Sequence, residues 1–514
     1  MLIIGGGITG AGIARDLALR GVPCIVVEKH DINAGASGAN HGLLHSGARY
    51  VSNDPHAAKE CRIEGEILKR LAPECIEDTG GLFIAVEGDD ETYVADFPGL
   101  CRKSNIPVQE VSPQDVLEME PALSKKVIAA YHVPDASIDP FKLTMENLYQ
   151  ARDHECSLLR HTEVIGFQRE KGRIVSTQLK NALTGDTFAV HADQVVNATG
   201  AWSKEIAALA GCRVDLLYSK GSLLVAHSRL TQQVINRLRP SSNADILVPG
   251  GTVSILGTTS IRIESLDEIY PTVKEIDFIV GEGAAMIPRL ETTRYIRAYA
   301  GVRPLIGSQS MDDDRDVSRS FALFSHEKDG LKNFITITGG KLTTYRLMAE
   351  KTADLICNRL GVSLSCPTKE APLPPTGATK WTQPGIAPKE WMKHHLPDDM
   401  LLCECEMVPK SIVNRLIESI HDQDGTPDLM ALGLRSRIGK GACQGTFCAL
   451  RIAAYLYSIR ELESTEGLES IKAFISERWR GIRPLLWDIP LIQAELQEAL
   501  YCGFFGIELN DIQP

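Results

Sequence analysis

Short apolar runs alternate with small-residue turns near the start of the chain. Residues 2–4 are an apolar run that ends at a glycine-rich turn, and residues 24–27 are a second run containing β-branched residues. Between them, apolar residues recur at helical spacing from 10 to 20, and Gly21 is placed to end that helix. The pattern predicts a strand, a helix and a second strand. Because only three apolar residues precede Gly5, the first strand is expected to be short unless its start lies upstream.

Farther along, the pattern predicts a chain that mixes helices and strands. Amphipathic helical stretches alternate with strands from 55 to 190, and strand-like segments dominate 215–335. We assign these segments to a second sheet; they include 222–226, 254–257 and 333–338. Helical spacing returns at 342–360, and prolines then interrupt the pattern from 364 to 398, which is typical of a linker.

Composition and charge narrow the classes of function. The chain has 514 residues, of which 44% are hydrophobic and 23% charged, as in soluble globular proteins of two or three domains. No apolar run approaches the roughly 18–20 residues needed to cross a bilayer, and no secretory signal is evident. We expect the protein in the cytoplasm, or at the cytoplasmic side of the inner membrane through a partner. A net charge of −12 argues against nucleic-acid binding.

The glycine turn after the first strand fits a dinucleotide-binding fingerprint. Gly5 permits the tight turn, Gly7 allows the backbone to approach a pyrophosphate, and Gly10 allows the helix to pack closely on the sheet. The helix N-terminus then faces the phosphates. Glu28, at the end of the second strand, is placed to accept hydrogen bonds from ribose hydroxyls. The alternative is a plain glycine-rich turn, and the fingerprint by itself does not distinguish FAD from NAD.

Three further small-residue segments favour FAD. They lie at 35–42, 197–202 and 338–341, with Leu342 directly after the third, and each stands where a strand passes into a turn or a helix. An extended FAD that runs through a domain needs contacts from such distant segments. The predicted cofactor-binding residues in them are Ser37, His41, Gly42, Ala198, Gly200, Trp202, Gly339, Gly340, Lys341 and Leu342.

Several motifs together resemble one family, the FAD-dependent glycerol-3-phosphate dehydrogenases of the D-amino-acid-oxidase-like superfamily, in particular their anaerobic, quinone-linked group. The motifs are GGGITGAGIARDLALRG, GASGANHGLLHSGARYV, NATGAW, AGVRPL and ITGGKLTTYR. The resemblance implies oxidation of sn-glycerol 3-phosphate to dihydroxyacetone phosphate, with hydride transfer to FAD and electrons passing to quinone. It also implies partners: a second catalytic or flavin subunit, with FMN possible in the complex, and a membrane-anchoring iron–sulfur subunit.

The same resemblance places cationic and aromatic side chains in the substrate pocket, where a phosphate dianion needs arginine or lysine. The implied residues are Arg49, Tyr50, Arg303, Arg319 and Lys341. By chemistry, His45 is the natural base for the hydroxyl proton. The alternative is that His45 is a flavin-contacting or core histidine, and the sequence leaves both open. We assign catalytic roles to His45, Arg49, Arg303 and Lys341.

Four cysteines near the C-terminal end form two close pairs, Cys403-x-Cys405 and Cys443-x4-Cys448. Four thiolates on two short loops suit either a 2Fe–2S cluster or a structural zinc ion. Zinc sites more often use C-x2-C pairs, and the pattern resembles the small 2Fe–2S domain of bacterioferritin-associated ferredoxin. We expect a 2Fe–2S cluster, which would give electrons a route away from the flavin.

The predicted fold is α/β: a Rossmann-type FAD-binding domain interleaved with an antiparallel-sheet substrate domain, followed by a small helical four-cysteine domain. The predicted parts are 1–362 for the oxidoreductase (FAD-binding segments 1–50, 190–205 and 335–360, substrate domain mainly 215–335), 363–399 for the linker, 400–455 for the 2Fe–2S domain and 456–514 for a helical extension. Two other functions stay open. One is an FAD-dependent amino-acid, opine or 2-hydroxyacid dehydrogenase, and the other is a non-catalytic electron-relay subunit.

Overall fold

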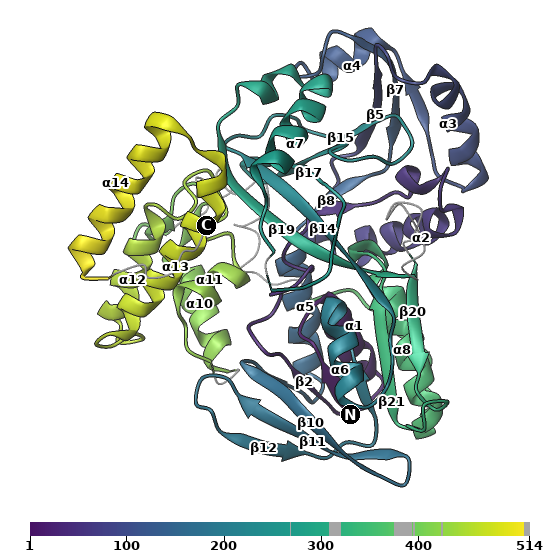
Figure 1. The fold of residues 1–514 in the computed structure, drawn as a ribbon, viewed down its shortest axis with the longest axis vertical. Coiled ribbons are helices and arrows are strands. Elements are labelled where there is room, and N and C mark those ends of the chain that lie inside the picture. Colours follow the sequence, from purple (N-terminus) through teal and green to yellow (C-terminus); the bar gives the residue numbers. More distant parts are fainter. Residues whose placement is uncertain (268, 308–319, 375–392, 394–395, 423–424, 508–514) are drawn as a thin grey trace.

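The main parts of the protein are two large sheets with their covering helices and a C-terminal group of helices (Figure 1). The structure is a computed structural model that describes residues 1–267, 269–307, 320–374, 393, 396–422 and 425–507. Most of the expected linker, 375–392 and 394–395, and the predicted substrate residue Arg319 lie outside these ranges.

The first sheet has six strands in the order β20-β21-β13-β1-β2-β9. All neighbours in it are parallel except β20 and β21. Its strands are β1 (Leu2–Ile4), β2 (Cys24–Val27), β9 (Cys156–Leu159), β13 (Val195–Asn197), β20 (Phe321–Ser325) and β21 (Phe334–Gly339). The predicted strand–helix–strand unit at the N-terminus is therefore confirmed, with a first strand of three residues.

Helices and a small second layer cover this sheet. Three helices pack into one apolar cluster with it: α1 (Ile8–Leu19), α5 (Pro140–Arg152) and α8 (Tyr345–Leu360). A second cluster joins the sheet to α6 (Ser203–Leu209) and to an antiparallel three-stranded sheet of β10 (Thr162–Glu170), β11 (Arg173–Asn181) and β12 (Thr187–Val190). Strands buried in this way from both faces read as continuous apolar runs, which is why β1 and β2 were recognisable in the sequence.

The second sheet has nine strands and is antiparallel except where β15 pairs with β5. Its order is β18-β14-β17-β16-β15-β5-β7-β6, with β19 paired to β14. The strands are β5 (Gly81–Val86), β6 (Gln109–Val111), β7 (Val127–Val133), β14 (Leu216–Ala226), β15 (Val234–Arg237), β16 (Ile246–Gly250), β17 (Val253–Gly257), β18 (Ile261–Ile263) and β19 (Tyr295–Ile306). The interleaved antiparallel sheet is confirmed. The assignment of 333–338 to it was wrong, because β21 pairs in parallel with β13 in the first sheet.

Four helices and a small sheet lie around the second sheet. They are α2 (Pro55–Leu71), α3 (Glu91–Lys103), α4 (Pro113–Met119), α7 (Val273–Met286) and a three-stranded sheet of β3 (Leu43–Leu44), β8 (Ala136–Ile138) and β4 (Ile76–Glu77). The start of α2 is fixed locally: the side chain of Asp54 accepts a hydrogen bond from the backbone N–H of Ala57, and Pro55 occupies the first turn. Because α2 follows directly on the segment with the predicted catalytic residues, this cap helps to fix that segment.

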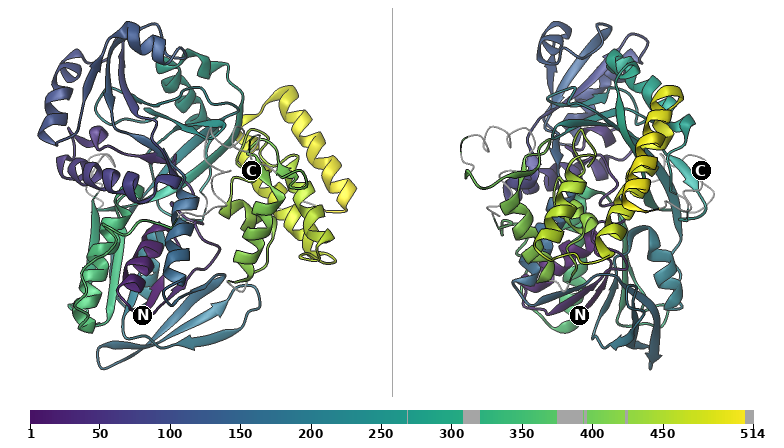
Figure 2. Two further views of the ribbon diagram at one scale, coloured as in Figure 1. Left: turned by 180° about the vertical axis from the view of Figure 1, so that it is seen from behind. Right: turned by 90° about the vertical axis from the view of Figure 1, so that its left-hand side faces the viewer.

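The C-terminal helices share one apolar core. The elements are β22 (Leu401–Cys403), β23 (Val408–Pro409), α10 (Lys410–His421), α11 (Leu429–Arg435), α12 (Cys448–Ser458), α13 (Glu466–Ile482) and α14 (Asp488–Phe505). Their core cluster runs from Leu402 to Ile507 and so crosses the boundary expected at 455. Figure 2 shows these helices beside the two-sheet body, with α14 outermost. In the described ranges, no helix is both long and apolar enough to cross a membrane.

Ion pairs join the helical part to the body. Arg435 and Arg160 both bind the carboxylate of Asp31, at 2.9 and 3.0 Å, and these side chains are buried. Arg297 of β19 binds Glu477 of α13 at 2.6 Å. Breaking a buried charge cluster is costly, because the remaining charge loses its partner. The helices are therefore firmly seated on the body.

Candidate active site and four-cysteine site

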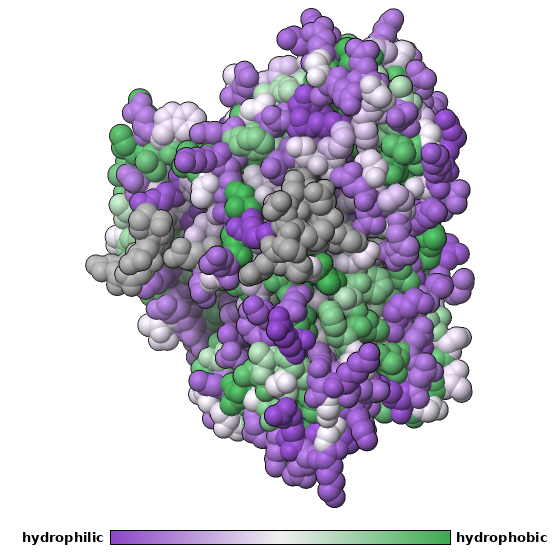
Figure 3. Space-filling model, turned by 45° about the vertical axis from the view of Figure 1, so that its right-hand side comes forward, coloured by the Kyte–Doolittle hydropathy of each residue, from purple (hydrophilic) through white to green (hydrophobic). Residues whose placement is uncertain are grey.

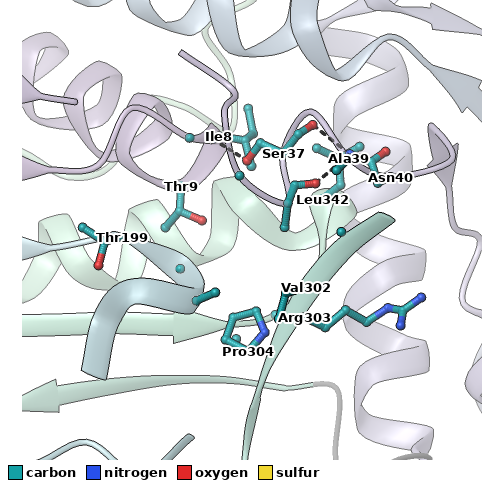
Figure 4. Close-up of a pocket in the computed structure, with 18 of the residues that line it drawn as sticks. Ile8, Thr9, Ser37, Ala39, Asn40, Thr199, Val302, Arg303, Pro304 and Leu342 are labelled. Atoms are coloured by element: carbon teal, nitrogen blue, oxygen red, sulfur yellow. Dashed lines mark hydrogen bonds between the residues drawn. The ribbon is translucent and has the colours of Figure 1, made fainter. Parts of the chain in front are cut away.

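A cavity of about 640 Å³ runs between the two sheets and brings the predicted segments together. Figure 4 shows part of its lining, with Arg303 on one strand and the turn that contains Ser37 and Ala39 across from it. The predicted cofactor residues that line the cavity are Gly5, Gly7, Glu28, Ser37, His41, Ala198, Gly200, Trp202, Gly339, Gly340, Lys341 and Leu342. Of the predicted set, Gly10 and Gly42 are not among its lining residues.

Gly10 and Gly42 do not line this cavity but lie next to segments that do. A Cβ added at Gly10 would lie 2.0 Å from the carbonyl oxygen of Gly5, so only glycine allows α1 to pack against the preceding turn. Gly42 lines a second cavity, of about 900 Å³, between the body and the C-terminal helices. Gly5 has φ +113° and an added Cβ there would lie 2.6 Å from the carbonyl oxygen of Ala198. The glycines thus bring the turn, α1 and the segment after β13 into contact.

We expect Gly10→Ala to release the dinucleotide cofactor, because the added methyl group would push α1 away from the turn at Gly5. Flavin absorbance per protein should fall at least about fivefold, and the melting temperature should fall with it. Gly99→Ala in α3 is the control, since nothing lies within 4 Å of a Cβ added at Gly99. A Gly10→Ala protein that purified with its full flavin content would contradict this account.

The adenosine end of the cavity is built around Glu28. Its carboxylate accepts hydrogen bonds from the backbone N–H groups of Gly6, at 2.7 Å, and His30, at 2.9 Å. Burial raises the pKa of Glu28, and these two hydrogen bonds oppose that shift. The N-terminus of α1 opens on the cavity at Gly7, and the backbone N–H of Ile8 donates to the Oγ of Ser37 at 3.0 Å. A helix N-terminus that faces the cavity, with a half-buried acid at the end of the next strand, fits the pyrophosphate and ribose of FAD.

The other end of the cavity is polar and gathers the predicted catalytic residues. The Oη of Tyr50 lies 3.4 Å from the Nε2 of His45, and the ammonium of Lys341 lies 4.6 Å from the centre of the Tyr50 ring. The rings of His41 and His45 are 5.9 Å apart. Arg49 and Arg303 line the same cavity. Residues from the turn after β3, from β19 and from the segment after β21 therefore meet at one end.

A buried carboxylate for which the sequence held no signal orients Arg49. The Nη2 of Arg49 donates to Asp245, at 3.2 Å, and to the carbonyl of Ser242, at 2.8 Å. Asp245 has no exposed surface and also binds Arg239 at 2.6 Å. The Nη1 of Arg49 is buried and makes no hydrogen bond to any described residue. An orphan guanidinium nitrogen beside the cavity is suited to an anionic oxygen of a ligand.

Arg303 is oriented by the strand end beside it. Its guanidinium donates to the Oγ1 of Thr258 and, at 3.2 Å, to the carbonyl of Thr259. Thr258 and Ser260 also line the cavity. The sequence analysis did not predict these residues. Their signal was the run of hydroxyl side chains at 258–260, directly after the strand predicted at 254–257. Buried contacts of this kind hold an arginine in one direction and lower the entropy that binding costs.

Both histidines at the polar end are held in the neutral form. Burial lowers the pKa of His45 well below its usual value, and the positive charges of Arg49 and Lys341 add to the effect of His41. Burial, with Arg303 and Arg49, lowers the pKa of His41 to about 3. A neutral imidazole has a lone pair that can accept a proton. His45 therefore satisfies the chemical requirement for a base.

The four predicted cysteines converge at one place in the C-terminal helices. The Sγ of Cys405 lies 3.8 Å from that of Cys403 and 3.6 Å from that of Cys443. The thiol of Cys448 interacts with both Cys403 and Cys443, which closes the ring. Hydrogen bonds among the thiols lower the pKa of Cys443 and raise that of Cys405. Metal binding requires deprotonated thiols, and these hydrogen bonds favour loss of a proton from Cys443.

Backbone N–H groups point at each sulfur. They belong to Glu406 for Cys403, to Cys443 for Cys405, to Gly445 and Phe447 for Cys443, and to Gly439 for Cys448. A Cβ added at Gly441 would lie 2.7 Å from the Sγ of Cys405, so the backbone approaches the sulfurs closely there. N–H···S hydrogen bonds stabilise thiolates that carry the charge of a bound metal.

Comparisons with known proteins also indicate an FAD-dependent oxidoreductase over most of the chain. Residues 1–355 match the model of the family described as FAD dependent oxidoreductase. The A subunit of the anaerobic glycerol-3-phosphate dehydrogenase of Escherichia coli is 42% identical over 99% of this chain and 97% of its own length. The corresponding A1 subunit from Haloferax volcanii is 36% identical over 98% of this chain and 90% of its own length. The glycerol-3-phosphate dehydrogenase from Bacillus halodurans, solved with FAD, superposes with a TM-score of 0.65 at 22% identity, over 95% of this chain and 96% of that one.

Proposed function

Because the chain belongs to the FAD-dependent oxidoreductases and, within them, to the family of anaerobic glycerol-3-phosphate dehydrogenase A subunits, we propose that it oxidises sn-glycerol 3-phosphate to dihydroxyacetone phosphate. Bound FAD supplies the hydride acceptor for the hydrogen on C2. The observation that carries the proposal is the polar end of the cavity, where Arg49 and Lys341 act on neutral His45, and Arg303 and Arg49 act on neutral His41.

The cations bind the phosphate group of the substrate. Arg303 is held by Thr258, and Arg49 by the buried Asp245. The buried Nη1 of Arg49 gains its missing hydrogen-bond partner from the ligand. Lys341 adds positive potential at the same end of the cavity. A dianion requires several such charges, whereas the carboxylate of an amino acid or a 2-hydroxyacid requires one arginine.

His45 takes the proton from the C2 hydroxyl. Its Nε2 is the nitrogen that lies 3.4 Å from Tyr50, and its backbone N–H donates to the Oγ1 of Thr343 at 3.1 Å, which fixes the segment. The hydroxyl proton moves to the imidazole as the C–H bond breaks, so the carbonyl of the product forms without an alkoxide in the cavity. The imidazolium that results is short-lived because the neighbouring cations disfavour it.

An anaerobic absorption spectrum tests substrate and cofactor together. We expect the flavin bands of the purified chain to bleach on addition of sn-glycerol 3-phosphate, with dihydroxyacetone phosphate formed in equal amount to the flavin reduced. Amino acids, opines and 2-hydroxyacids are the control panel and should leave the flavin oxidised. Flavin that bleached with dithionite but not with the phosphate substrate would refute the substrate assignment. Bleaching by a member of the panel would select the competing dehydrogenase class.

The four cysteines bind a 2Fe–2S cluster. In a tetrahedral zinc site with Zn–S distances of about 2.3 Å, every pair of sulfur atoms is about 3.8 Å apart. All four cysteines lie in described ranges, and no three of their sulfur atoms fall within 4.8 Å of one another. The sulfurs of Cys403 and Cys443 lie 3.8 and 3.6 Å from that of Cys405, so four thiols meet in one place. The C-x-C spacing and the resemblance to the bacterioferritin-associated ferredoxin domain support a cluster over one central ion.

Metal analysis of the purified chain distinguishes the two occupants. We expect about two iron atoms and two sulfides per chain, with little zinc, after anaerobic purification. Cys405→Ser should lose most of the iron and lower the melting temperature of the C-terminal helices, because the cluster ties two loops together. Cys502→Ser is the control, since Cys502 lies outside the four-cysteine site. One zinc per chain without sulfide would contradict the cluster.

Electrons leave the chain for quinone through partner subunits at the membrane. The relatives from Escherichia coli and Haloferax volcanii are each named as one subunit of an enzyme, which supports a complex of several subunits. We propose a second flavin subunit, in which FMN is possible, and an iron–sulfur subunit that anchors the assembly to the cytoplasmic side of the inner membrane. Quinone reduction by the co-purified complex, absent from the isolated chain, is the result expected.

A further inference from the structure

A stripe of large apolar side chains lies exposed along α14. It consists of Ile489, Ile492, Leu496, Leu500 and Phe504, whose exposed fractions are 61, 62, 59, 63 and 84%. Successive members are three or four residues apart, so they share one face of the helix. Trp487, which directly precedes the helix, is 75% exposed. No residue of α14 is buried. We call this set of six the α14 stripe.

The opposite face of α14 fixes the helix to the protein. Cys502 and Phe505 pack against the core of the C-terminal helices, and the Oη of Tyr501 donates to the carbonyl of Thr446 at 3.4 Å. Figure 1 shows α14 at the outer edge of the molecule, beyond α12 and α13. On the face drawn in Figure 3, hydrophilic side chains are interspersed with hydrophobic ones. Single exposed apolar residues are ordinary, but a continuous helical stripe marks a docking surface.

We propose that the α14 stripe docks the partner subunit that takes electrons from this chain, through an apolar helix or groove bordered by lysine and arginine. This inference rests on the proposed function, because it assigns the partner a role in the same electron transfer. The partner buries the stripe as the apolar core of the interface, and its basic border meets the acids of α14.

Charge selects this occupant over the alternatives. Between 488 and 505 the helix carries Asp488, Glu495 and Glu498 and no lysine or arginine. An anionic lipid surface would repel such a helix, whereas amphipathic helices that bind membranes carry basic residues. A second copy of the chain, packed antiparallel along the stripe, would bring Glu495 next to its own counterpart. A partner with a basic border avoids both the repulsion by anionic lipid and the repulsion between two copies of Glu495.

The position of α14 relative to the four-cysteine site supports an electron acceptor. Tyr501 of α14 contacts Thr446, which lies between Cys443 and Cys448. The next residue, Phe447, is 67% exposed and also has its backbone N–H directed at Cys443. A protein seated on the stripe therefore lies beside the place where electrons would leave the chain.

The test uses the full chain co-expressed with its partner subunits and purified through a tag on the chain. The variant is the pair Leu496→Gln and Leu500→Gln, which keeps helix-compatible side chains of similar length. Ile63→Gln with Val273→Gln is the matched control, because these residues are 59 and 60% exposed on other helices. We expect partner retention and quinone reduction to fall at least about tenfold in the variant alone. Reduction of a soluble dye with sn-glycerol 3-phosphate should stay within about twofold of the unaltered chain.

Other outcomes overturn the inference. Unchanged partner retention in the variant would refute docking at the stripe. Binding of the unaltered chain, and not of the variant, to vesicles of phosphatidylcholine and phosphatidylglycerol would replace the partner by a lipid surface. A dimer of the isolated chain that the variant dissociates would replace it by a second copy. If the unaltered chain fails to reduce the dye, the proposed function fails, while partner retention still decides where the partner docks.

Discussion

Replacing Arg303 by alanine should lower kcat/KM for sn-glycerol 3-phosphate about a thousandfold, or by about 4 kcal/mol of transition-state stabilisation. The reason is that the guanidinium is fixed by Thr258 and Thr259 at the polar end of the cavity, so its charge is aimed without further ordering. Alanine leaves a phosphate oxygen without its charged partner. Steady-state dye reduction, normalised to flavin content, measures the effect.

Two controls assign the loss to the phosphate group. Glycerol lacks the phosphate, so its slow oxidation should change little in Arg303→Ala. Thr258→Ala keeps the arginine but removes one of its hydrogen bonds, and about a tenfold loss is expected. Turnover within tenfold of the unaltered chain in Arg303→Ala would contradict a catalytic pocket at this position and favour a pure electron relay.

Replacing His45 by glutamine should lower kcat about a hundredfold to a thousandfold, with a smaller change in KM, because the base that takes the hydroxyl proton is lost. Glutamine is close in size and keeps a hydrogen-bonding end near Tyr50. His41→Gln is the comparison, since His41 lines the cavity among the predicted cofactor contacts. It should affect flavin binding more than the rate with bound flavin. If both variants lost the same activity in proportion to flavin, His45 would be a flavin contact and not the base.

The pH profile provides an independent test of His45. Burial lowers the pKa of this imidazole below its usual value of 6.5, so the neutral, proton-accepting form persists as the pH falls through 6.5. Activity that depends on it should be lost only at lower pH, through the depressed pKa. An acidic limb of kcat/KM at or above 6.5 that disappears in His45→Gln would contradict this environment.

Local sequence was sufficient to predict the glycine-rich turn and many of the residues that line the cavity. Gly5, Gly7 and Gly10 act over a few residues, because a turn and a helix start are decided by short-range sterics. The α/β fold with an interleaved antiparallel sheet followed from hydrophobic periodicity and family resemblance. The four cysteines were recognisable because close spacing within each pair puts two thiols on one loop.

The tertiary structure decided what depends on segments distant in the sequence. β21 looked like another strand of the second sheet, yet it pairs with β13, because an apolar run does not encode its neighbour. The second sheet also takes β5, β6 and β7 from before residue 215.

The same physical limit applies within the active site. The sequence determined which cations and which imidazole are available, but side-chain direction and burial depend on packing between distant segments. Only the fold placed Asp245 against Arg49 and Thr258 against Arg303, and these partners fix where the positive charge points. Likewise, the sequence shows that α14 contains acidic and apolar residues, but their exposure depends on how the helix packs against the other C-terminal helices.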